Sequence, residues 1–64
     1  MTGIVKKIVV DKGFGFILGE DKKDYFFHRT SLKNAQFEDL TVGDEVTFED
    51  AEGSKGPRAE DIYI

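Results

Sequence analysis

Two short stretches decide the fold of this chain: KGFGFI at residues 12–17 and DYFFH at residues 24–28. Each has the length of a β-strand and is rich in aromatic and β-branched residues, which favour strands. The charged residues 20–23 between them include no apolar side chain and predict a turn. The two stretches are therefore expected to form a β-hairpin.

Outward from this hairpin, the rest of the chain repeats the pattern of short strands and turns. Three further runs have strand composition, and they lie at residues 4–10, 46–48 and 62–64. No segment keeps a 3.6-residue apolar period, although residues 30–40 are expected to include one short helical turn with Thr30 or Ser31 as its cap. Five short strands in 64 residues predict an all-β fold closed into a barrel, because closure leaves no edge strand exposed.

Aromatic residues fall on both faces of the predicted hairpin. Side chains alternate along a strand, so Phe14 and Phe16 share one face, and Phe26 and His28 share one face of the next strand. The opposite faces and the other strands supply enough apolar residues for the single interior of a small barrel. The expected core is Ile17, Tyr25, Phe27, Val46, Phe48 and Ile62, with Val5 and Leu32. Phe14, Phe16, Phe26 and His28 are then left facing solvent, where clustered aromatics mark a binding surface. If the parity is reversed, these four are ordinary core residues.

The first strand and the glycines carry two further structural signals. In residues 4–10, neither set of alternate side chains is cleanly apolar, which predicts a β-bulge or strong coiling of the strand. Gly13 and Gly15 lie on the opposite parity to the two phenylalanines, where they would let the sheet curve tightly. Their spacing is not the GxGxxG of a dinucleotide-binding loop, so no phosphate cradle is expected there.

Composition excludes several classes of function. The chain has 64 residues and a mass of 7.2 kDa, so we expect one domain over residues 1–64, with no room for a large internal active site. It has no cysteine and one histidine, so we expect no disulfide and no metal site. No nucleophile–base pair stands out, and we expect neither enzymatic activity nor a cofactor. The sequence contains no apolar run of the roughly 20 residues that cross a bilayer and no secretory signal, which fits a cytoplasmic protein.

Charge is unevenly distributed along the chain. The net charge is −4, which by itself argues against a nucleic-acid ligand. Residues 1–34, however, carry seven basic and four acidic side chains, whereas residues 35–64 carry two basic and nine acidic ones. A basic first half and an acidic second half predict two faces or two ends of opposite charge; the alternative is that these charges only solvate a small surface.

The pattern as a whole resembles the cold-shock domain family. KGFGFI resembles the first ribonucleoprotein motif of that family, and DYFFH resembles the second. Three further blocks match in order and spacing: residues 3–6 (GIVK), 40–48 (LTVGDEVTF) and 55–59 (KGPRA). The resemblance covers essentially the whole chain and implies a five-stranded antiparallel OB-type barrel that binds single-stranded RNA or DNA. It also implies a monomer that acts as an RNA chaperone or as a regulator of transcription or translation.

The resemblance assigns roles to individual residues. Phe14, Phe16 and Phe26 occupy positions whose rings stack on unpaired bases, at about 1–3 kcal/mol per base. His28 is expected to stack or to form a hydrogen bond, although a lone histidine is usually structural. The basic residues expected to meet the nucleic-acid backbone or a base edge are Lys6 and Lys12, with Lys55 as a basic loop residue. Phe37, in the long loop, matches a further stacking position; the alternative is that it packs down on its own loop.

The chain departs from the family pattern at three aromatic positions. Lys7 stands where the family usually has a tryptophan, Ile8 stands where an aromatic residue normally follows, and Arg29 stands where another phenylalanine follows the histidine. Lys7 adds charge without stacking, whereas the guanidinium of Arg29 both stacks on bases and pairs with phosphate. The departures predict binding that is weaker and more salt-sensitive than in typical members.

A protein-interaction module is the alternative function, because small barrels also bind peptides and exposed aromatics suit protein interfaces. Salt dependence separates the two functions. Binding to single strands weakens with salt at a log–log slope near −0.7 per phosphate contact, whereas apolar peptide binding hardly responds.

Overall fold

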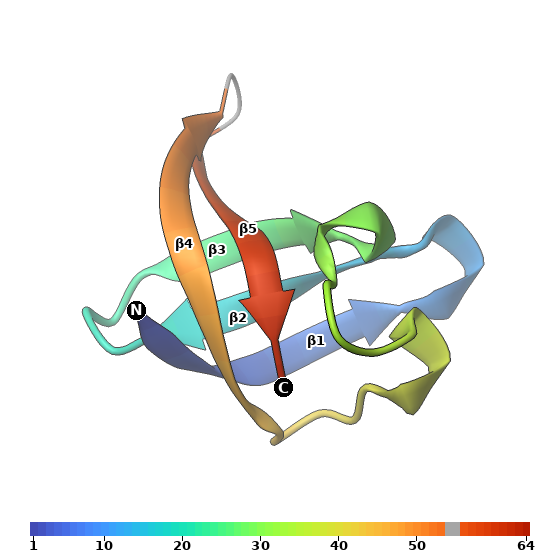
Figure 1. The fold of residues 1–64 in the computed structure, drawn as a ribbon. Coiled ribbons are helices and arrows are strands. Elements are labelled where there is room, and N and C mark those ends of the chain that lie inside the picture. The colour runs from blue at the N-terminus through green and yellow to red at the C-terminus, as the bar shows by residue number, and fades with distance from the viewer. Residues whose placement is uncertain (54–55) are drawn as a thin grey trace.

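The five strands of the computed structural model wind into a closed barrel (Figure 1). The structure describes residues 1–53 and 56–64. The strands are β1 (Thr2–Val9), β2 (Phe14–Gly19), β3 (Asp24–His28), β4 (Glu45–Gly53) and β5 (Gly56–Tyr63). Three single 3-10 turns lie between them: η1 (Val10–Lys12), η2 (Arg29–Ser31) and η3 (Phe37–Asp39). The predicted all-β, five-stranded OB-type barrel is confirmed.

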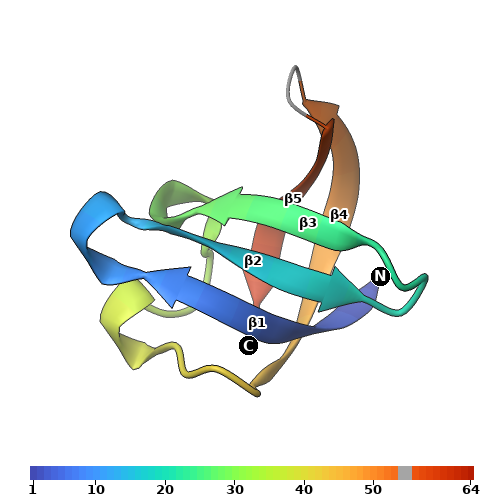
Figure 2. The same ribbon diagram turned by 180° about the vertical axis from the view of Figure 1, so that it is seen from behind.

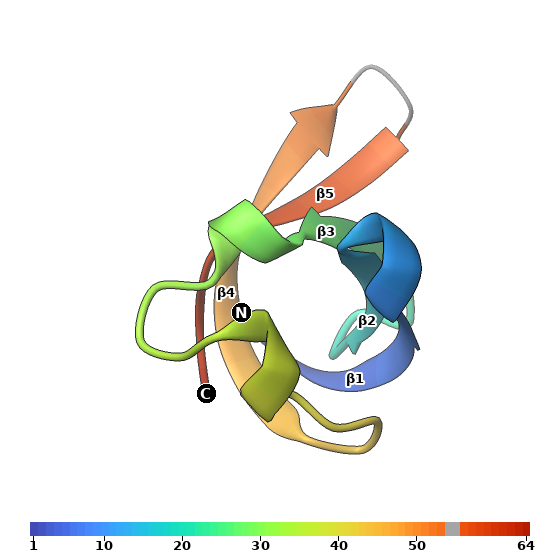
Figure 3. The same ribbon diagram turned by 90° about the vertical axis from the view of Figure 1, so that its right-hand side faces the viewer.

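The barrel closes through one parallel contact. Around the wall the strand order is β1-β2-β3-β5-β4, and every neighbouring pair except β3–β5 runs antiparallel. The register pair Phe26 and Arg58 joins β3 to β5. From behind, β1, β2 and β3 lie side by side as one wall (Figure 2). Along the barrel, the ends of β4 and β5 project beyond β3 as a hairpin (Figure 3).

The core agrees with the alternation read from the sequence. Seven of the eight residues expected inside are buried, and the eighth, Leu32, is half-buried and packs against them. The buried hydrophobic residues are Val5, Ile17, Tyr25, Phe27, Phe37, Leu40, Val46, Phe48, Ala59 and Ile62. Three core residues were not expected from the sequence: Phe37 and Leu40, which come from the loop between β3 and β4, and Ala59 of β5.

Gly15 explains why β2 can curve so closely against its neighbours. A Cβ atom at this position would collide with the Lys7 carbonyl oxygen and would lie 2.8 Å from the ring of Phe27. Only glycine at this position allows β1 and the Phe27 ring to approach β2 as closely as they do. The tight sheet curvature expected opposite Phe14 and Phe16 thus has a specific cause.

The predicted bulge lies in the middle of β1. The register between β1 and β2 shifts between Val5 and Lys7, so that Lys6 is the extra residue. Before the bulge Val5 faces Ile17 in the core; after it Lys7 is opposite Phe16. The bulge therefore brings Lys7 to the outer face of the wall.

The loop from β3 to β4 is organised by two turns rather than by one. The first, η2, begins earlier than expected, and its cap is His28, whose side chain accepts a hydrogen bond from the Thr30 amide. The expected cap at Thr30 or Ser31 is therefore wrong. In η3, the Asp39 carboxylate accepts a hydrogen bond from the backbone amide of Gln36 at 3.3 Å. Within residues 1–53 and 56–64, no helix is long and apolar enough to cross a membrane.

β4 and β5 are much longer than the apolar runs that predicted them. Their outer parts form the two-stranded ribbon that projects from the barrel (Figure 3). In this ribbon Glu49, Asp50 and Glu52 are exposed. A ribbon solvated on both faces needs no apolar alternation, so its sequence carries no strand signal.

Candidate nucleic-acid interface

Three phenylalanine rings touch one another on the outer face of β2 and β3. The ring centroids of Phe14 and Phe26 lie 5.4 Å apart, those of Phe16 and Phe26 5.9 Å, and those of Phe14 and Phe16 6.2 Å. All three side chains are half-buried. We call this set, Phe14, Phe16 and Phe26, the aromatic platform.

The register of the hairpin produces the platform. Phe16 lies directly opposite Phe26, and Phe14 lies directly opposite His28. The intervening residues of both strands, which include Ile17 and Phe27, are fully buried in the barrel. The platform residues therefore point away from the core, as expected from the period of two.

A groove of about 620 Å³ runs between the platform and the β4–β5 hairpin. The described residues that line it are Phe14, Phe16, Phe26, Gly53, Gly56, Pro57 and Arg58. The platform forms its floor and the hairpin its wall, because β5 pairs with β3 only near Phe26 and then diverges with β4. The expected binding residue Lys55 lies outside the described residues.

Arg58 and Pro57 were not identified as site residues from the sequence. Both belong to the KGPRA block, where the resemblance to the family assigns a role only to Lys55. The partner of Arg58 across the parallel bridge is Phe26, one of the three platform rings. The missing signal was the pairing of β3 with β5, which sequence alternation does not reveal.

Two expected lysines lie beside the platform with different electrostatic surroundings. The Lys6 ammonium is 3.1 Å from the Asp24 carboxylate, and both side chains are about half exposed. Lys7 is opposite Phe16, is exposed, and forms no ion pair with any described residue. Phosphate would therefore compete with Asp24 for Lys6, whereas Lys7 is available without such competition.

A second group of polar residues lies at the far end of the hairpin. Lys12, in η1, is exposed and unpaired among the described residues. The Arg29 side chain lies across Gly13, where a Cβ atom would be 3.1 Å from its Cδ. His28 is half-buried, and its Nδ1 is engaged by Thr30 in the cap of η2. His28 therefore has a structural role as the cap of η2, and its position opposite Phe14 also places it beside the platform.

Phe37 is not part of this surface. Its side chain is 7 % exposed, and its ring centroid lies 6.2 Å from that of Phe27 in the core. The η3 turn folds the loop inward and buries both Phe37 and Leu40. The structure corrects the expectation that Phe37 offers a stacking face: it fills the core.

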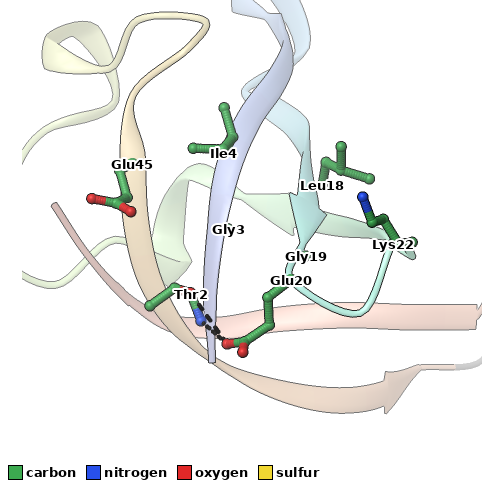
Figure 4. Close-up of a pocket in the computed structure, with 8 residues that line it drawn as sticks. All are labelled: Thr2, Gly3, Ile4, Leu18, Gly19, Glu20, Lys22 and Glu45. Atoms are coloured by element: carbon green, nitrogen blue, oxygen red, sulfur yellow. Dashed lines mark hydrogen bonds between the residues drawn. The ribbon is translucent and has the colours of Figure 1, made fainter.

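The opposite end of the wall holds a smaller hollow of about 180 Å³ (Figure 4). There the Glu20 carboxylate accepts hydrogen bonds from the Thr2 amide at 2.8 Å and from the Thr2 hydroxyl at 3.2 Å. These bonds lower the pKa of Glu20 below its ordinary value. The Glu20 carboxylate already accepts hydrogen bonds from Thr2 of β1, so it has less capacity to bind a ligand in this hollow. Among the described residues, no cluster of His, Asp or Glu side chains could hold a metal ion.

Comparison with known proteins identifies the family. The profile of the "Cold-shock" DNA-binding domain matches residues 1–64. The chain is 42 % identical over 61 residues to cold shock protein 2 of Lactiplantibacillus plantarum, a match that covers 95 % of this chain and 92 % of that protein. It is 45 % identical over 65 residues to the cold shock-like protein CspB of Escherichia coli, which covers all of this chain and 92 % of that protein. The cold shock-like protein CspE of Bacillus anthracis is 40 % identical over 62 residues, or 97 % of this chain and 92 % of that protein. The chain belongs to the cold-shock DNA-binding domain family.

Proposed function

We propose that this protein binds single-stranded RNA or DNA by stacking unpaired bases on Phe14, Phe16 and Phe26. Lys6, Lys7, Lys12 and Arg29 attract the phosphates, and the protein acts as a monomeric single domain. Its role is that of an RNA chaperone or a regulator of transcription or translation, with no chemical step.

The observation that carries the proposal is the contact of three rings at the floor of an open groove. Three rings at centroid spacings of 5.4 to 6.2 Å form one half-buried aromatic cluster that lines the groove. Unpaired bases offer flat π-faces, and each base stacked on such a ring contributes about 1–3 kcal/mol. In a duplex the same faces are already stacked on neighbouring base pairs, so the groove selects unpaired strands.

Charge placement supports the same ligand despite the net charge of −4. Among the residues that the structure describes, Lys7, Lys12 and Arg29 are exposed, form no ion pair and lie on or beside the β1–β2–β3 wall, whereas the exposed acidic residues Glu49, Asp50 and Glu52 belong to β4. Three phosphate contacts would give a log–log salt slope of about −2, so affinity would fall about 20-fold between about 50 and 200 mM salt.

Binding of this kind acts on RNA structure by mass action. A protein that binds unpaired strands and not duplexes shifts the equilibrium towards the unpaired form. No nucleotide hydrolysis is needed for this shift.

Fluorescence anisotropy of a labelled thymidine heptamer, at two salt concentrations, tests the proposal. We expect saturable binding that weakens with salt, and no binding to the same sequence in a duplex. Phe26→Ala should weaken binding about 5- to 150-fold, the equivalent of one stacked base. Tyr63→Ala is the matched control, because Tyr63 is exposed and lies away from the platform, beside Met1 and Phe48.

Failure of the heptamer to bind at low salt would refute the proposal. Binding that ignores salt, or that is lost equally in Phe26→Ala and Tyr63→Ala, would contradict the assigned site and favour a protein partner.

A further inference from the structure

Arg58 occupies the position nearest to a base stacked on Phe26. It pairs with Phe26 at the parallel seam of the barrel, and it lines the aromatic groove. The next residue, Ala59, is fully buried in the core, so Arg58 points to the outer side, as Phe26 does. The edge of a base lying on the Phe26 ring would therefore meet the Arg58 side chain on the β5 side.

The surroundings of Arg58 fix which of its donors a ligand can reach. Its Nε is buried and has no hydrogen-bond partner among the described residues. The Glu60 carboxylate lies 3.3 Å from this atom as an ion pair. The stem runs past Gly53, where a Cβ atom would stand 3.5 Å from the Arg58 Cδ. The side chain as a whole is 41 % exposed, so the terminal Nη amines are the donors left for a ligand.

The ligand that suits these donors is a neutral base edge rather than a phosphate. The Glu60 carboxylate already pairs with this guanidinium, so a phosphate would have to compete with it and would meet its negative charge. A neutral base meets no such repulsion.

Guanine fits the remaining donors best. The adjacent O6 and N7 atoms of guanine accept two parallel hydrogen bonds from one guanidinium, which makes this the commonest specific arginine–base contact. Thymine and uracil have no such pair of adjacent acceptors. We propose that Arg58 makes the groove prefer guanine at the base stacked on Phe26, with Glu60 as the positioning residue. This inference rests on the proposed single-strand binding.

Three labelled heptamers test the inference: all thymidine, and the same strand with one central guanine or one central cytosine. For the unmodified protein, we expect the guanine strand to bind about 5- to 150-fold more tightly than the thymidine strand, the usual discrimination of a bidentate contact. Arg58→Met should bring this ratio close to one while the affinity for the thymidine strand changes little. Arg29→Met, which removes the other arginine of the chain, should leave the ratio intact and weaken all three strands together.

Several outcomes would overturn the inference. A guanine-to-thymine ratio near one in the unmodified protein does so while leaving the proposed function intact, provided that the thymidine strand binds. Equal weakening of all strands by Arg58→Met, with a salt slope shallower by about 0.7, would identify a phosphate contact instead. A preference for cytosine would refute the O6/N7 contact. If no strand binds, the proposed function fails and the inference fails with it.

Discussion

Replacing Lys7 with tryptophan should extend the aromatic platform by one ring. Lys7 is exposed and lies directly opposite Phe16 across the β1–β2 ladder, after the bulge at Lys6. Directly opposed residues in a sheet have Cβ atoms about 4.5–5.5 Å apart, so an indole at this position would reach the Phe16 ring. A fourth ring next to Phe16 would offer a stacking surface to one more base.

The size of the effect depends on salt, because the substitution exchanges a charge for a ring. The added stack contributes about 1–3 kcal/mol. The lost phosphate contact costs about 1.2 kcal/mol at about 50 mM salt and about 0.7 kcal/mol at about 200 mM, from a slope of 0.7 per phosphate. At about 200 mM salt, Lys7→Trp should therefore bind the thymidine heptamer about 2- to 50-fold more tightly than the unmodified protein.

Two readouts measure this prediction. Anisotropy gives the affinity as salt is varied, and the log–log slope should become shallower by about 0.7 in Lys7→Trp. The chain has no tryptophan, so quenching of the new indole by the heptamer reports directly on stacking at this position. Lys33→Trp is the matched control: Lys33 is half exposed, pairs with Asp61 at 3.4 Å and lies on the loop after η2.

Weaker binding by Lys7→Trp at about 200 mM salt would refute the placement of residue 7 beside the platform. An unchanged salt slope, or an equal gain in Lys33→Trp, would contradict it as well.

Three further predictions concern stability, each measured by urea denaturation. Gly15→Ala should lower the free energy of unfolding by about 1–3 kcal/mol, because its Cβ would press into the Phe27 ring; Gly43→Ala meets no atom within 4 Å, so its cost comes from its φ of 101° alone, and a larger loss there would contradict the packing argument. Phe37→Ala should cost about 3–5 kcal/mol while the folded protein keeps its affinity for the heptamer, and a selective loss of affinity would restore Phe37 to the site. The Tyr25 hydroxyl donates to Asp21 at 2.6 Å, which lowers the pKa of Asp21 and raises the pKa of Tyr25 to about 12. Unfolding should therefore become easier as the pH falls below about 4 and as it rises from about 10 to 12, and Tyr25→Phe should lose both contributions; parallel pH profiles for the two proteins would show that the bond contributes nothing.

The hairpin of β2 and β3 was predictable because two runs of strand composition flank a charged turn, and side chains in a strand alternate between its two faces. Ile17 and Phe27 lie inside and Phe16 and Phe26 outside, as that alternation requires. The same rule predicted the bulge in β1, since no single register there keeps apolar residues on one face. Local rules therefore sufficed wherever one face of a strand is buried and the other is not.

The remaining features depend on contacts between segments far apart in the sequence. Phe37 enters the core from a loop without apolar period, so nothing local marks it as buried. The outer parts of β4 and β5, which form the acidic ribbon, have no buried face, so their sequence shows no apolar alternation that would predict a strand. Arg58 becomes a groove residue only because β5 pairs in parallel with β3, a contact that closes the barrel. These features could be found only once the strand order was known.

The most direct test of the central claim is an NMR titration of the aromatic ring protons with the thymidine heptamer. A base stacked on a ring shifts that ring's protons upfield. If bases stack on the platform, the protons of Phe14, Phe16 and Phe26 should shift far upfield, and those of the core rings Phe27 and Phe37 should shift little. Binding that leaves the three platform rings unshifted, or that moves the core rings most, would contradict this claim.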